Sequence, residues 1–103
     1  MITLEVTILK SWKERTIGLL GETKARPVLL KTRFGIHTFG MKFSIDVLVL
    51  DQHNTVVTLV ENLQQNLIFV WSPRFDTIIE LPAGAIKKYT ITVGEKLQLT
   101  PLT

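Results

Sequence analysis

The chain has 103 residues, of which 46% are hydrophobic and 20% are charged, with 12 basic and 9 acidic side chains. These values are typical of a single folded domain, which we place at 1–103, and exclude a disordered chain. The sequence has no cysteine, which excludes disulfides, thiolate zinc sites and a cysteine nucleophile.

The net charge of +3 does not indicate a nucleic-acid-binding surface. The basic residues are scattered, and the densest group is Lys87-Lys88, whereas nucleic-acid-binding faces concentrate Lys and Arg among aromatic residues. The N-terminus lacks the pattern of a signal peptide, and the apolar runs are shorter than the roughly 20 residues of a membrane helix. We therefore expect a cytoplasmic monomer or weak homo-oligomer, with no nucleic acid and no membrane among its partners.

Alternating apolar and polar residues of β-branched type predict strands along most of the chain. In chain order these strands cover residues 2–9, 28–33, 43–51, 55–63 and 76–82, and a short strand follows the turn at Gly94-Glu95. The segment 66–72, NLIFVWS, is compatible with a further strand or with a buried apolar loop. Residues 51–54 predict the turn of a hairpin.

One helix is expected in the N-terminal part, because Ser11 and Glu14 form a capping box and Gly21 provides a stop signal. Residues 34–40, FGIHTFG, hold two glycines and predict an irregular loop with a positive φ angle. Residues 83–89 predict a single helical turn. The fold class that follows is α+β but predominantly β: a small twisted, partly closed, barrel-like sheet of about six short strands with one short N-terminal helix.

The stretch IHTFGMKFSIDVLVLD, residues 36–51, contains the first candidate site. Both faces of its strand are apolar, which predicts a central strand and places Asp46 in an interior or a cleft. A buried carboxylate needs partners. The partners that we consider are His37, Thr38, Arg33 and Lys42, together with backbone N–H groups of the loop around Gly40.

Two interpretations of Asp46 follow. In the structural one, Asp46 holds the glycine-bearing loop by accepting two or three backbone hydrogen bonds. In the functional one, Asp46 and His37 form a carboxylate–imidazole pair at the mouth of a pocket.

Glu80, in the stretch IIELPAG, is the second candidate. It precedes Pro82 at the end of a strand, where pockets form. The alternative is a structural role, in which Glu80 pairs with Arg33, Arg74 or Lys87 and Gly84 permits a tight turn.

Other catalytic and metal-binding motifs are absent from the sequence. The six glycines are dispersed, with no phosphate-binding loop. His37 and His53 lie 16 positions apart, and no short ligand spacing links them to an acidic residue. We therefore expect no bound metal and no cofactor.

The blocks HTFGMKFSIDVLVLD, IIELPAG and ITVGEKLQL, with RTIGLLG before them, resemble the domain-of-unknown-function-192 family from about Arg15 to Leu99. The resemblance implies a compact β-rich fold with a short N-terminal helix, and no established activity. Relatives often carry a proline after the fourth strand, where this chain has NLQQNLIF, which implies a different ligand preference if that segment shapes a pocket. The positions that match the family are Arg15, Gly18, His37, Thr38, Gly40, Lys42, Asp46, Asp51, Glu80, Pro82, Ala83, Gly84 and Gly94.

The leading functional hypothesis is a non-catalytic binding or accessory module for an unknown small molecule or protein. Its shallow pocket would be lined by His37, Thr38, Lys42, Asp46 and Glu80, with Asp46, Gly40, Pro82 and Gly84 in structural roles. One alternative is a small hydrolase-like enzyme in which His37 works with Asp46 or Glu80. The other is a structural protein-interaction domain that uses an open sheet edge.

Overall fold

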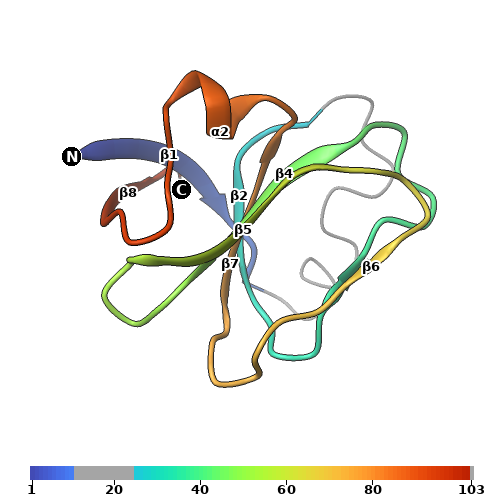
Figure 1. The fold of residues 1–103 in the computed structure, drawn as a ribbon, viewed down its shortest axis with the longest axis horizontal. Coiled ribbons are helices and arrows are strands. Elements are labelled where there is room, and N and C mark those ends of the chain that lie inside the picture. Colours follow the sequence, from blue (N-terminus) through green and yellow to red (C-terminus); the bar gives the residue numbers. More distant parts are fainter. Residues whose placement is uncertain (11–24, 103) are drawn as a thin grey trace.

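The computed structural model describes residues 1–10 and 25–102, which form eight strands and one short helix (Figure 1). The strands are β1 (Ile2–Ile8), β2 (Val28–Lys31), β3 (Ile36–His37), β4 (Ile45–Leu50), β5 (Val56–Leu63), β6 (Ile68–Phe69), β7 (Thr77–Pro82) and β8 (Leu97–Pro101). The helix is α2 (Ala85–Lys88). The helix predicted over 11–21 lies outside the described residues.

Six strands form one mixed, curled sheet in the order β5-β4-β7-β2-β1-β8. β1 runs parallel to both β2 and β8, and the other neighbours are antiparallel. β3 and β6 form a separate two-stranded sheet. β6 lies on the opposite side of the molecule from the two termini (Figure 1). The curled six-stranded sheet forms a half-barrel, in agreement with the predominantly β prediction (Figure 1).

The prediction that residues 45–50 form a central strand is confirmed, because all six residues of β4 are buried. Leu48 and Leu50 belong to a core cluster that also includes Leu81 of β7 and Ile86 of α2. The alternate residues of β4 belong to a second cluster on the other face of the sheet. That second cluster consists of Leu9, Val28, Leu30, Ile36, Met41, Ile45, Val47, Val49, Leu63 and Ile78.

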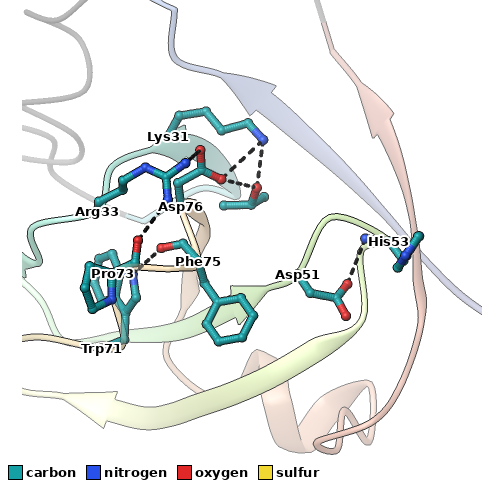
Figure 2. A network of polar contacts seen from close by, with 9 residues as sticks. Lys31, Arg33, Asp51, His53, Trp71, Pro73, Phe75 and Asp76 are labelled. Carbon is teal, nitrogen blue, oxygen red and sulfur yellow. Dashed lines mark hydrogen bonds and ion pairs between the residues drawn. The ribbon is translucent and has the colours of Figure 1, made fainter.

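The hairpin between β4 and β5 turns on Asp51. One oxygen of its carboxylate, Oδ1, accepts the backbone N–H group of His53 at 2.8 Å (Figure 2) and that of Thr55 at 3.0 Å. These hydrogen bonds, with that from Thr55 contributing most, hold the pKa of Asp51 below its ordinary value. The turn predicted at 51–54 is confirmed, and Asn54 supplies its positive φ of 63°.

The single helical turn predicted over 83–89 is confirmed by α2. Two details differ from the sequence-based prediction. The loop predicted over 34–40 contains β3, although both of its glycines adopt the expected positive φ. Residues 66–72 are not a buried loop, since Leu67, Ile68 and Val70 are exposed and only the two residues of β6 pair. Pairing of β6 with β3 depends on contacts between distant segments, which local patterns do not encode.

Candidate functional site

Asp46 is fully buried, and its carboxylate is satisfied by three backbone donors. Oδ1 accepts the N–H of Asn62 at 2.8 Å, and Oδ2 accepts those of Gly84 at 3.1 Å and Ile86 at 2.9 Å. Asp46 therefore joins β4 to β5 and to the start of α2. Gly84 permits this arrangement because its φ of 95° lies in the left-handed region.

The prediction that Asp46 accepts two or three backbone hydrogen bonds is confirmed, but the predicted donors are wrong. Its partners lie at the β7–α2 turn and in β5, and not in the loop around Gly40. The error has a physical reason: Asp46 shares a sheet face with Leu48 and Leu81, and α2 packs on that face. The glycine-bearing loop lies toward the other cluster, where Ile36 and Met41 are buried.

Thr38, and not Asp46, anchors the loop around Gly40. Its hydroxyl donates to the carbonyl of Gln64 at 2.6 Å and accepts the N–H of Leu67 at 2.9 Å. Its carbonyl accepts the N–H groups of Met41 and Asn66, each at 3.1 Å. Thr38 is completely buried, so it fastens the β3 segment to the β6 segment and has no exposed atom to offer a ligand.

His37 lies apart from Asp46. It sits in β3 opposite Ile68, is exposed, and stacks on Phe39 with a ring separation of 5.4 Å. Both oxygens of Asp46 are occupied by backbone donors, so the two residues do not form the carboxylate–imidazole pair. Lys42 is also exposed and follows the buried Met41.

Glu80 is buried as well, with 4% of its surface exposed. In the sheet register it lies between Val47 of β4 and Val28 of β2, and residues that are directly opposite point to the same face. Both valines belong to the second cluster, so Glu80 points away from the face that holds Asp46. The three candidates His37, Asp46 and Glu80 therefore do not line one pocket.

The carboxyl of Glu80 has no hydrogen-bond partner at Oε1. Two of the cations expected to pair with it have other contacts. Arg33 contacts Asp76 at 3.4 Å and the carbonyl of Pro73 at 2.8 Å (Figure 2). Arg74 lies over the ring of Phe75. Burial without a partner raises the pKa of Glu80 to about 7.

A groove opens on the sheet where β2 begins. β1 pairs with β8 over residues 2–6 but reaches β2 only from Thr7, which is opposite Val28. The N–H groups of Thr7 and Leu9 donate to the carbonyls of Pro27 and Leu29. Along a strand, successive residues direct their main-chain groups to opposite sides. The N–H and C=O groups of Thr3 and Glu5 therefore point away from β8, toward a position where none of the described residues forms a strand.

Pro27 explains why the ladder stops there. If the parallel pairing continued by one step, the N–H of residue 27 would donate to the carbonyl of Glu5, and proline has no N–H. The chain before Pro27 also leaves the sheet, because Ala25 packs against the second cluster. In the described residues, the pairing of β1 with β2 therefore begins at Thr7 and Val28.

This groove has a volume of about 530 Å³. One wall is β1, with the buried Leu4 and the exposed Thr3 and Glu5. The other wall is the end of β7 together with α2 and the residue that follows it; α2 lies above β1 in Figure 1. The residues of that wall are Leu81, Pro82, Ala83, Gly84, Ala85, Lys88 and Tyr89, and Pro27 lies at the end of the groove.

Of the residues that line the groove, Pro82 and Gly84 are predicted from sequence in structural roles, whereas Thr3, Glu5 and Lys88 are not predicted to belong to a site. The available signal is Pro27, immediately before the strand predicted over 28–33. Its consequence depends on the parallel pairing of β1 with β2, and local sequence does not show which strands pair.

Within residues 1–10 and 25–102, no group of three or more His, Asp or Glu side chains is placed to hold a metal ion. In the same residues no helix is long and apolar enough to cross a membrane.

The fold and these sites define a small β-rich domain with a half-barrel sheet, an aspartate that anchors a one-turn helix, and an interrupted sheet beside it. The chain belongs to the DUF192 family, described as an uncharacterized ACR, whose model matches residues 2–99. It is also similar to the UPF0127 protein of Pyrococcus abyssi, with 32% identity over 100 residues that cover 91% of this chain and 85% of that protein.

Two crystal structures share the fold. A protein of unknown function from Novosphingobium aromaticivorans superposes with a TM-score of 0.78 at 12% identity, covering 88% of this chain and 71% of that one. A proposed transcription regulator from Sinorhizobium meliloti gives 0.74 at 18% identity, covering 88% and 78%. At these identities the similarity concerns the fold alone.

Proposed function

We propose that this protein is a non-catalytic binding module and that its ligand site is the groove between β1 and the β7–α2 turn. The observation that carries the proposal is the break in the β1–β2 ladder, which leaves main-chain donors and acceptors beside a cavity of about 530 Å³. Ligand pockets typically measure roughly 300–1,000 Å³ and combine apolar walls with a few polar groups.

A binding role agrees better with this groove than catalysis does. Its ionisable side chains are Glu5, Lys88 and Tyr89, all exposed. General acid–base catalysis needs a group with a tuned pKa that is oriented by neighbours. Asp46 is fully engaged by backbone donors, and Glu80 faces the other side of the sheet. The hydrolase hypothesis therefore lacks its proposed pair of His37 and Asp46.

A thermal-shift screen of metabolites, metals and short peptides tests the proposal. It compares the wild-type protein with Ala83→Trp, which places an indole at an exposed position of the groove wall. We expect compounds that raise the melting temperature of the wild type and have little effect on Ala83→Trp.

The matched control is Val93→Trp. Val93 is exposed before β8 and does not line the groove. Compounds that stabilise both tryptophan variants as well as the wild type would place the ligand site elsewhere and contradict the proposal.

A further inference from the structure

We infer that the groove takes an extended peptide segment of a partner protein, which adds a strand beside β1 in the place that β2 leaves open. This inference rests on the proposed function, since it names the ligand class for the same groove. It draws on three features of the described residues: the direction of the open main-chain groups, the apolar floor and the charges at the rim.

The main-chain groups come first. Thr3 and Glu5 lie two residues apart on one edge of β1, so their N–H and C=O groups repeat at the spacing of a β-ladder. Only another main chain in extended conformation presents complementary donors and acceptors at that repeat. Peptides that add to open sheet edges obtain their affinity from such hydrogen bonds.

The floor of the groove selects the side chains. Leu4 and Leu81 both line the groove and belong to the core cluster on the α2 face. In an added strand, alternate side chains point to one face of the sheet. One side chain of the peptide would therefore lie on the Leu4–Leu81 floor, where a small or medium apolar residue fits, and its neighbours would point to solvent.

The rim of the groove carries one acidic and one basic side chain. Glu5 belongs to the β1 wall and Lys88 to the α2 wall, and both side chains are exposed. In an added strand, a basic residue next to the apolar position would share the face of Glu5, whereas an acidic residue two positions from it would share the α2 face with Lys88. Because these charges are solvent-exposed, we expect them to influence the choice of partner more than the affinity.

The groove also differs from the ordinary edges of the sheet. The edge strand β8 ends at Pro101, and proline weakens edge-to-edge pairing. Beside Thr3 and Glu5 the open edge lies in a groove with β7 and α2 as its second wall. A peptide there contacts protein on two sides, while a peptide on β8 would contact one.

The test begins with a displayed library of random heptapeptides. The library is selected on the wild-type protein of residues 1–103 and counter-selected on Ala83→Trp. We expect a family of sequences with one apolar residue at a fixed position. If no peptide sequence survives the counter-selection, the inference is wrong.

The second step measures where the selected peptide binds. Amide hydrogen exchange is followed by NMR with and without the synthetic form of the most enriched heptapeptide. We expect the exchange of the Thr3 and Glu5 amides to slow at least tenfold when the peptide saturates the protein. The amides of Leu4 and Val6 point to β8 and serve as internal controls whose exchange stays unchanged.

Two further results separate this inference from the proposed function. If the peptide binds and the exchange of Thr3 and Glu5 does not change, strand addition is wrong. If only small molecules show stabilisation that Ala83→Trp abolishes, the groove remains the ligand site and the peptide class is wrong. If neither peptides nor small molecules are sensitive to Ala83→Trp, both proposals fail.

Discussion

Asp46 and Glu80 are buried carboxyl groups in neighbouring strands, and they differ in their surroundings. Asp46 accepts three backbone hydrogen bonds, whereas Oε1 of Glu80 accepts none. The sheet register places them on opposite faces. Their substitution is therefore expected to have opposite consequences for stability.

Replacing Asp46 with Ala is expected to lower the free energy of unfolding by more than about 2 kcal/mol, because three buried N–H groups lose their acceptor. Urea denaturation measures this change. The matched control is His37→Ala at an exposed position, for which we expect a change within about 0.5 kcal/mol. A neutral result for Asp46→Ala would show that this carboxylate does not anchor α2.

Glu80 makes stability depend on pH. Its pKa is about 7 in the folded protein and near 4.5 in the unfolded chain. The folded state therefore holds the proton more tightly, and stability falls as the pH rises from about 4.5 to about 7. Above that range the loss is complete, at about 3 kcal/mol.

Glu80→Gln removes this titration. The comparison uses urea denaturation of both proteins between pH 5 and pH 8, and the difference in slope isolates Glu80 from the other titrating groups. We expect the stability of Glu80→Gln, relative to the wild type, to increase with pH over this range. Equal slopes would mean that Glu80 is ionised and stabilised by a partner in the folded protein.

Among the elements, the β3–β6 pair depends on a close approach at Gly35. A Cβ atom there would lie 3.0 Å from the carbonyl oxygen of Phe69 and 3.0 Å from Cγ1 of Val70, and the φ of Gly35 is 99°. Gly94 has a similar φ of 94°, with nothing within 4 Å of a Cβ atom. The two positions share the backbone strain and differ only in the contact.

Gly94→Ala is expected to cost about 1 kcal/mol for the left-handed backbone alone. Gly35→Ala is expected to cost at least about 1 kcal/mol more, since the backbone of β6 must move. Denaturant melts of the two variants measure the difference. Equal costs would indicate that β3 and β6 separate easily.

Sequence patterns predict which strands this protein forms better than they predict which segments lie next to each other in the fold. The apolar run 45–50 predicts a central strand, and Pro82 marks the end of β7, because both depend on local chemistry. The partners of Asp46 and the exposed position of His37 depend on which distant segments meet. A carboxylate in an apolar strand signals that it needs donors, but the signal does not say from which segment they come.

The same limit applies to the groove. Pro27 is visible in the sequence, and its missing N–H matters only because β1 lies parallel beside it. Local patterns favour hairpins of consecutive strands, such as β4 and β5. The pairing of β1 with both β2 and β8 involves the two ends of the chain, which no turn signal connects.

For the molecule as a whole, the half-barrel is interrupted between β1 and β7, and Asp46 holds α2 at the border of the interruption. The anchor and the groove are thus connected, because Gly84 donates to Asp46 and also lines the groove. Asp46→Asn keeps the size of the side chain and replaces one acceptor oxygen. We expect it to weaken the binding of any ligand whose binding Ala83→Trp also weakens. Unchanged binding to Asp46→Asn would show that the groove does not depend on this anchor.

Amide hydrogen exchange of the free protein measures whether the edge of β1 that faces away from β8 is open. We expect the Glu5 amide to exchange at least tenfold faster than the amides of Leu4 and Val6, which point to β8 on either side of it. Thr3 should follow Glu5. Equal protection of Leu4, Glu5 and Val6 would mean that both edges of β1 are paired, and would contradict the interrupted sheet.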